Sequence, residues 1–276
     1  MKKLLLATIM VIALPLTVSA QSDDFGLWYS VGAEKSLSHK LSVGAEVELR
    51  TLDDAKKTDR WSGGVSADYK LTKWLKASAG YTFLYDKKEK RTFSYYDDED
   101  DEGEAWEGKV KKMRSADYWG PRHRFCVDLT ASQSFGRFKF SLRERWQYTY
   151  RPEKTVTRDK YEYVYEPDDG SLTDGYPTTE QDQKTYKKKY QSVMRTRFQA
   201  EYNIPKCKID PYASVEFCSS MDNYKMRYTF GFEWKLSKHH GVNVAYRYQD
   251  IHKESNDDSD DEPNMHIVSI GYKLKF

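Results

Sequence analysis

Arginine and glutamate recur at every second position in several segments of the chain. The pairs with this spacing are Arg143/Arg145, Arg195/Arg197 and Glu46/Glu48. In a β-strand, residues two apart lie on one face, so each pair presents two like charges side by side. A guanidinium binds a carboxylate or a phosphate through two parallel hydrogen bonds. These residues therefore predict either a path for an anionic solute or a structural network of ion pairs.

Histidine, serine and cysteine give little support for catalysis. His252 and His266 flank a connection that contains Ser255 and Ser259, but no nucleophile elbow or Ser-His-acid spacing is present. The three cysteines are Cys126, Cys207 and Cys218. Their odd number allows one disulfide and one free thiol, and we interpret them as incidental. No metal-ligand spacing is present, so we expect no catalytic residue, no metal site and no cofactor.

Two acidic runs stand apart from this pattern, at 97–104 and 256–262. Neither run has the spacing of an EF-hand calcium loop. The simpler interpretation is a pair of solvated outer loops kept soluble by charge. The alternative is weak binding of divalent cations next to lipopolysaccharide.

The elements that would position the paired charges are long amphipathic strands. From Tyr224 to Leu236, the even-numbered residues are apolar or aromatic, and the odd-numbered residues are polar or glycine. This period of two predicts a strand with one apolar face. Similar segments lie at 25–34, 41–50, 59–71, 75–85, 121–133, 138–150, 188–203, 208–219, 241–252 and 264–276. Each is close to the length of roughly 9–11 residues with which a tilted strand crosses a bilayer.

Composition favours a membrane barrel over a soluble sandwich. Mean hydropathy is −0.87, yet aromatic residues are 15% of the chain. A transmembrane barrel needs apolar residues only at alternate positions, and aromatic residues form its interfacial girdles. We predict an all-β fold, an antiparallel transmembrane β-barrel of about 10–12 strands, with an even number preferred. Short periplasmic turns would alternate with longer outer connections, notably at 87–119, 151–185 and 253–263.

Strand alternation then assigns the paired charges to the lumen. The residues predicted to line it are Arg143, Arg145, Arg195, Arg197, Arg227, Arg247, Glu46, Glu48, Glu201 and Glu233, together with Arg50, Asp68, Asp128 and Glu216. In a narrow barrel they would pair with one another, because an unpaired charge away from water is costly. In a wider barrel they would line an aqueous path.

Both ends of the chain resemble known signals, one for secretion and one for barrel assembly. Residues 1–20 combine a positive start, an apolar run and small residues before a cleavage site, which predicts a signal peptide and a mature barrel over 21–276. Lys2 and Lys3 account for the excess of 45 basic over 43 acidic residues, so the mature chain is formally neutral and nucleic acid is not an expected partner. The last strand resembles the signal read by the barrel-assembly machinery. The residues that carry this likeness are Ile270, Tyr272, Leu274 and Phe276.

The opening of the mature chain resembles a family of outer-membrane-type barrels. The segment Asp24-Phe25-Gly26-Leu27-Trp28-Tyr29, the hairpin over 31–50 and the arginine-rich strands are similar to domain of unknown function 2490, which is common in Bacteroidetes. The resemblance covers nearly all of the mature chain. It implies a barrel of the outer-membrane type and supplies no activity or functional residue.

Three functions remain open from the sequence. The first is a narrow channel for small polar or anionic solutes, and the second is a structural or interaction barrel with a plugged, salt-bridged lumen. The third is an outer-membrane lipid-modifying enzyme. All three place the mature chain in the outer membrane of a Gram-negative bacterium. Its expected partners are membrane lipid, lipopolysaccharide and the assembly machinery.

Overall fold

In the computed structural model, the described residues are 24–96, 109–163, 180–220, 223–253 and 264–276. Every regular element within these ranges is a β-strand. No helix in the described part of the chain is long and apolar enough to cross a membrane. The expected signal peptide over 1–20 and the acidic runs at 97–104 and 256–262 lie outside the described residues.

Thirteen strands pair into one sheet. They are β1 (Asp24–Ser36), β2 (Leu41–Leu52), β3 (Lys57–Lys70), β4 (Leu75–Tyr95), β5 (Val110–Phe135), β6 (Phe138–Arg151), β7 (Lys154–Glu162), β8 (Gln181–Tyr186), β9 (Lys189–Tyr202), β10 (Ile209–Ser219), β11 (Asn223–Lys235), β12 (His240–Lys253) and β13 (Met265–Lys275). The eleven segments expected to be strands each fall on one of these elements.

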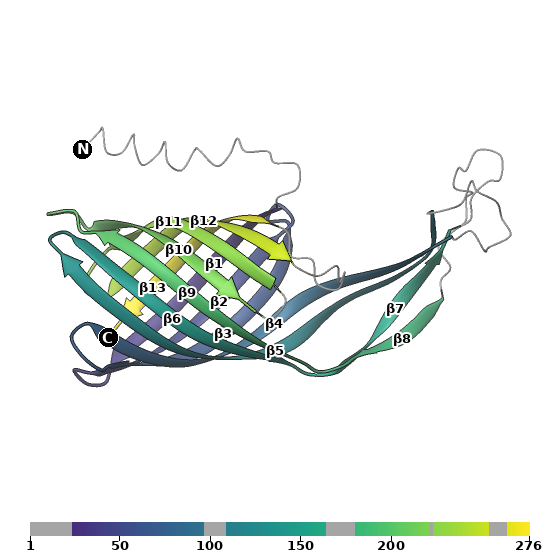
Figure 1. Cartoon of the computed structure of the whole chain (residues 1–276), viewed down its shortest axis with the longest axis horizontal. Coiled ribbons are helices and arrows are strands. Elements are labelled where there is room, and N and C mark those ends of the chain that lie inside the picture. The colour runs from purple at the N-terminus through teal and green to yellow at the C-terminus, as the bar shows by residue number, and fades with distance from the viewer. Residues whose placement is uncertain (1–23, 97–108, 164–179, 221–222, 254–263) are drawn as a thin grey trace, which may run out of the picture.

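Eleven of the strands close into a barrel (Figure 1). Strands β1–β6 and β9–β13 each pair with their neighbours, and β1 closes the ring against β13. All pairs in the ring are antiparallel except this last one, which is parallel from Asp24↔Met265 to Glu34↔Lys275. The predicted barrel fold is confirmed, but the preference for an even strand number is wrong. An odd number of alternating strands leaves the first and last running in the same direction.

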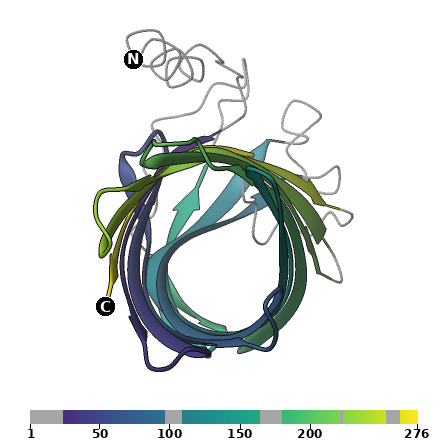
Figure 2. The same ribbon diagram turned by 90° about the vertical axis from the view of Figure 1, so that its left-hand side faces the viewer.

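The two faces of each barrel strand follow the alternation in the sequence. On β11, Tyr228, Phe230 and Trp234 are exposed, whereas Thr229 between them is buried. The exposed aromatic rings lie on the outer face of the ring of strands, which Figure 2 shows nearly end-on. The opposite face is polar, and its side chains meet inside the barrel.

One end of the barrel is formed by short turns, which we call the turn end. The turn between β5 and β6 is the tightest, because Phe135 and Phe138 already pair. Gly136 adopts a φ of 59° there, a left-handed conformation that glycine tolerates at little cost. Phe276 also lies at the turn end, where its amide donates to the Glu34 carbonyl.

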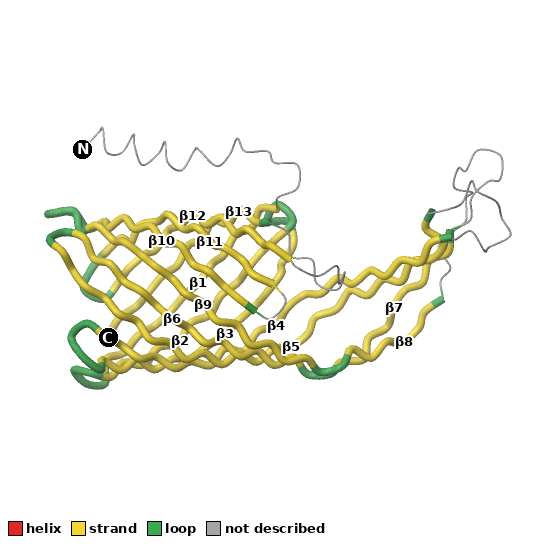
Figure 3. Tube along the Cα trace, in the orientation of Figure 1, coloured by secondary structure: helices red, strands yellow, loops and turns green. Residues whose placement is uncertain are grey.

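Four strand segments extend from the opposite end as an arm (Figures 1 and 3). The arm consists of 87–95 of β4, 110–119 of β5, and the hairpin of β7 and β8. Strand β5 pairs with β7 from Lys112↔Glu162 to Ser115↔Asp159. The prediction that 87–119 and 151–185 are loop connections is therefore wrong in part. Polar residues occupy both faces of β7 and β8, so these strands lack the strong alternation that revealed the others.

Candidate functional site

The inner face of the barrel brings four arginines together on two neighbouring strands. Arg143 and Arg145 lie on β6, and the register places them opposite Arg197 and Arg195 of β9. Like charges directly opposite one another are destabilising. The arrangement therefore requires carboxylates from other strands.

Glu216 of β10 supplies the first carboxylate. Its Oε1 accepts from Arg143 Nη2 at 2.7 Å, and its Oε2 accepts from Arg195 Nη2 at 2.8 Å. Arg227 Nη1 lies 3.4 Å from Oε2. Arg143 reaches Glu216 across the intervening strand β9, and Glu216 is only 4% exposed. Three guanidinium groups thus share one buried anion.

Three further carboxylates pair with arginines on the same strand or on a neighbouring strand. Asp128 accepts two hydrogen bonds from Arg145, at 2.7 and 2.6 Å. Asp86 accepts from both Arg60 and Arg122, one at each oxygen. Glu48 accepts from Arg50 Nε at 2.6 Å. Pairing of this kind offsets part of the cost of taking the charges out of water.

Trp28 of β1 forms an aromatic centre for three more contacts. The guanidinium carbon of Arg50 lies 3.7 Å from a ring centroid of Trp28, and those of Arg247 and Arg227 lie at 5.2 and 5.3 Å. Distances below roughly 6 Å give attractive cation–π contacts. Strands β12 and β13 separate β11 from β1, so the Arg227 side chain crosses the interior to reach this ring.

Together these groups form what we call the arginine belt. Its ten arginines are Arg50, Arg60, Arg122, Arg124, Arg143, Arg145, Arg195, Arg197, Arg227 and Arg247. Its carboxylates are Glu48, Asp86, Asp128, Glu216 and, within electrostatic range of Arg50, Glu46 and Asp59. Ten cations against six carboxylates leave a formal excess of four positive charges.

Several belt nitrogens also have no partner. Among the described residues, the buried atoms without a hydrogen-bond acceptor include Arg122 Nη2 and the Nε atoms of Arg124, Arg143, Arg197 and Arg227. Arg124 lies within electrostatic range of Arg50, Arg60, Arg122 and Arg195. A buried donor without an acceptor costs roughly 1–3 kcal/mol. An anion held between these guanidinium groups would remove that cost and offset part of the excess charge.

Two glutamates predicted to line the lumen lie apart from the belt. Glu201 is near the turn end, with Lys139 Nζ 3.4 Å from its Oε2. Glu233 is opposite Asp210 and Asn243 on the neighbouring strands. Arg143, Arg145, Arg195, Arg197, Arg227, Arg247, Glu46 and Glu48 lie in or beside the belt.

Sequence reasoning overlooked other members of the belt. Arg122 and Arg124 have the same two-residue spacing as Arg143 and Arg145, and this spacing could have identified them. Trp28 carried no such signal, because a single inward tryptophan does not stand out among many aromatic residues.

The last strand places its alternating apolar residues on the outer face. Ile270 and Phe276 are exposed, at 43% and 66%. The Tyr272 hydroxyl lies 2.5 Å from His240 Nδ1, and Leu274 pairs with His240 in the register. These positions describe the strand, and its part in assembly remains a prediction.

Histidines of the outer face contact tyrosines. His123 Nδ1 lies 2.8 Å from the Tyr81 hydroxyl, and His266 Nδ1 lies 2.6 Å from the Tyr246 hydroxyl. All three cysteines are free. Within the described ranges, no group of three or more His, Cys, Asp or Glu side chains could hold a metal ion.

Comparison with known proteins gives one family match and several structural likenesses. A family model described as "Protein of unknown function (DUF2490)" matches residues 25–260. No curated protein matches the chain. Among solved structures, the chain is similar to the β-domain of the Bordetella autotransporter Brka, with 10% identity, a TM-score of 0.47, and coverage of 84% of this chain and 78% of that one.

Two further structures have weaker likeness. The CymD monoaromatic hydrocarbon channel has 10% identity and a TM-score of 0.35, with 87% of each chain covered. An anion-selective porin from Comamonas acidovorans has 10% identity and a TM-score of 0.24, covering 88% of this chain and 82% of that one. At this level of identity the similarity concerns the fold alone.

Proposed function

Because the chain belongs to the DUF2490 family of proteins of unknown function and is an outer-membrane-type β-barrel, we propose its role from the barrel interior: a narrow channel for small anionic solutes. The observation that carries the proposal is the excess of guanidinium groups in the arginine belt, ten against six carboxylates. A purely structural network would be expected to balance its charges.

The chemistry of arginine supports an anionic solute. Its planar group presents donors in a fixed fork that matches carboxylate and phosphate oxygens. Rings of arginine or lysine are also the usual lining of anion-selective pores. The unpartnered nitrogens of Arg124 and Arg197 offer donors to a solute without first breaking an ion pair.

The strand number supports a narrow path. Barrels of about eight strands are filled by side chains, whereas those with about 16 hold an aqueous channel. Eleven strands fall between these limits. Most belt side chains are also largely shielded from solvent. We infer that a solute would pass in close contact with the guanidinium groups.

The same proposal places the mature chain in the outer membrane of a Gram-negative bacterium after removal of its signal peptide. Aromatic pairs on the outer face support this location. Near the arm, the rings of Tyr85 and Trp119 stack with centroids 5.3 Å apart. Near the turn end, the ring centroids of Phe138 and Tyr202 lie 4.9 Å apart. Such rings at both ends of the apolar band match interfacial girdles. Its partners would then be membrane lipid and lipopolysaccharide. The last strand would be the signal that the assembly machinery recognises.

A plugged structural barrel is the second candidate. The observation that favours it is the burial of the ion pairs, since Glu216 is 4% and Asp128 is 7% exposed. In that case the belt would fix the spacing of the strands and exclude solutes. The two candidates differ in whether ions cross the barrel.

The experiment is single-channel recording of the refolded mature protein in a planar lipid bilayer, with the anion-to-cation permeability ratio as readout. Arg124→Gln and Arg197→Gln are the informative variants, because neither guanidinium makes a hydrogen bond or close ion pair among the described residues. Lys238→Gln, in a turn outside the lumen, is the matched control for loss of one charge.

We expect anion-selective steps whose selectivity falls in both arginine variants and is unchanged in the lysine control. If the permeability ratio is unchanged in both arginine variants, the belt is not the selective element. A correctly folded but silent barrel would reject the channel and leave the plugged barrel.

A further inference from the structure

The outer face of β6 carries a carboxyl group at the middle of the strand. Alternation places Glu144 on the same face as Leu142 and Trp146, whose side chains are exposed. Glu144 lies midway between Phe138 and Tyr150, the aromatic residues near the two ends of this strand. Aromatic residues at such positions mark the two membrane interfaces. In the proposed membrane location, Glu144 therefore lies in the hydrocarbon layer and faces lipid.

The residues around Glu144 on this face are largely apolar. In the register, Leu129 of β5 and Thr196 of β9 flank it directly. Met194 and Phe198, the next residues of β9 on this face, are exposed. On the barrel part of β5, on β6 and on β9, all of which the structure describes, no other Asp, Glu, Lys or Arg side chain shares this face. Glu144 is thus an isolated carboxyl group in an apolar surface.

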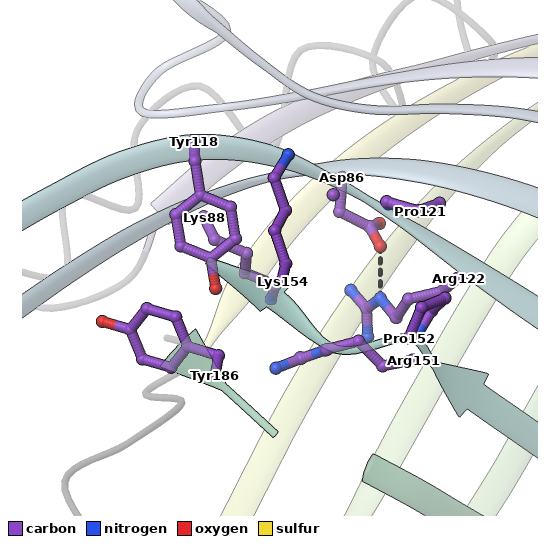
Figure 4. A pocket seen from close by; sticks show the side chains of 10 residues that line it. Asp86, Lys88, Tyr118, Pro121, Arg122, Arg151, Pro152, Lys154 and Tyr186 are labelled. Atoms are coloured by element: carbon purple, nitrogen blue, oxygen red, sulfur yellow. Dashed lines mark hydrogen bonds and ion pairs between the residues drawn. The ribbon is translucent and has the colours of Figure 1, made fainter. Parts of the chain in front are cut away.

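Glu144 has a single hydrogen-bond partner. Thr196 Oγ1 donates to its Oε2 at 2.8 Å, and its Oε1 has no partner in the described part of the chain. The carboxylates of the arginine belt differ, because arginines bind them, as Arg122 binds Asp86 (Figure 4). A polar group that lacks partners in hydrocarbon is costly. Ionisable residues in membrane segments are consequently rare, and those that occur mark functional contacts.

A second copy of the chain is the partner that suits this group. Two copies inserted in the same direction are related by a two-fold axis along the membrane normal, so each residue meets residues at its own depth. Near that axis, Glu144 would meet Glu144 of the second copy. A protonated carboxyl group both donates and accepts a hydrogen bond, so two such groups are complementary to each other. A different protein would instead have to expose a donor or a cation to lipid at this depth, at a cost of its own.

The surrounding side chains support such a contact. Association in a membrane depends on close packing and on polar contacts, because lipid is itself apolar. Contacts that exclude solvent around a polar centre strengthen that centre. Five large apolar side chains surround Glu144, each 46–51% exposed, and they are Leu129, Leu142, Trp146, Met194 and Phe198.

We propose that the outer face of β6 and β9 is an interface between two copies of this chain in the membrane, with the two Glu144 carboxyl groups hydrogen-bonded at its centre. The inference goes beyond the proposed channel, since the interface lies outside the lumen. It rests on the proposed membrane location, and the experiment separates the two.

The test is sedimentation equilibrium of the refolded mature protein in neutrally buoyant detergent micelles, after its insertion into phospholipid vesicles has been verified. We expect a reversible equilibrium between monomer and dimer. A chain that does not insert into vesicles would reject the membrane location and the interface together. A barrel that inserts but stays monomeric at every concentration would reject the interface alone, and lipid or a different protein would then cover Glu144.

Substitutions of Glu144 test the carboxyl contact. Glu144→Leu should weaken dimerisation at least about fivefold, because leucine packs but forms no hydrogen bond. Glu144→Gln should retain dimerisation within about twofold, since an amide also donates and accepts. Asp250→Leu is the matched control, because Asp250 is a carboxyl group of the outer face on the distant strand β12. Equal dimerisation of Glu144→Leu and the wild type would overturn the inference.

A second pair of variants locates the interface. Leu129→Trp adds bulk beside Glu144 and should weaken dimerisation, whereas Val65→Trp on β3 should leave it unchanged. The two original side chains are 50% and 59% exposed, so both variants place a tryptophan on the outer face at a similar cost. Weaker dimerisation in Val65→Trp but not in Leu129→Trp would place the contact on another face and contradict the assignment.

Discussion

Replacing Glu216 with glutamine tests the energetics of the belt most directly. The substitution keeps the size of the side chain but removes the anion shared by Arg143, Arg195 and Arg227. Solvent screening is weak at this site, because the Glu216 side chain is 6% exposed and the three arginine side chains are 12–15% exposed. Loss of one partner from a buried charge cluster costs about 3–5 kcal/mol. Glutamine retains one acceptor oxygen, so we expect a loss near 3 kcal/mol.

The assay is urea unfolding in phospholipid vesicles, followed by tryptophan fluorescence after reversibility has been established. Glu201→Gln is the matched control. Its partner Lys139 is 3.4 Å away with a side chain 52% exposed, so less than about 1 kcal/mol should be lost. In the double variant Glu216→Gln/Arg195→Gln, removal of one unpaired cation should restore part of the loss. If Glu216→Gln falls within about 0.5 kcal/mol of the wild type, then water hydrates these guanidinium groups and the belt is not a dry cluster.

Three other predictions concern separate parts of the chain. Trp28→Ala should lower unfolding stability by about 3 kcal/mol in the same assay, because it empties a buried site and removes cation–π contacts; an unchanged midpoint would contradict the packing. Gly231→Ala should cost about 1–3 kcal/mol, since its added Cβ would lie 2.6 Å from Ala245 Cβ, and a normal unfolding curve would argue against this close approach. On the arm, hydrogen bonds from Arg158 lower the pKa of Asp182, so the pairing stabilises β7–β8 above the ordinary carboxyl range and is lost as pH falls through the lowered value. Protection of the β7–β8 amides, relative to their intrinsic exchange rates, should therefore fall only below about pH 4, and Asp182→Asn should remove that dependence.

The barrel strands could be predicted because membrane lipid imposes a strict alternation. Segments such as 224–236 place an aromatic residue at nearly every second position, and the structure has β11 there. The arm could not be found in this way. Strands β7 and β8 contain polar residues on both faces, and in water their pairing depends on neighbours far away in the sequence.

Only part of the arginine belt could be predicted from the sequence. Alternation along the strands indicates that Arg143, Arg195 and Glu216 all face the lumen. It does not indicate that both arginines reach the same carboxylate. That contact depends on the register of three strands and on the barrel curvature, which bring β6 and β10 together across β9. The grouping of Arg122, Arg151 and Lys154 where the arm meets the barrel could not be predicted, because it depends on an arm whose residues the sequence had assigned to loops.

The parallel pairing of β1 with β13 determines the sidedness of the polypeptide. The barrel domain starts at the arm end with Asp24 and leaves its last strand at the turn end beside Phe276. An even-stranded barrel returns both of its ends to one side, whereas in the proposed membrane location this chain would make a net passage across the bilayer. A tag fused before Asp24 would thus be displayed in the compartment opposite to one fused after Phe276.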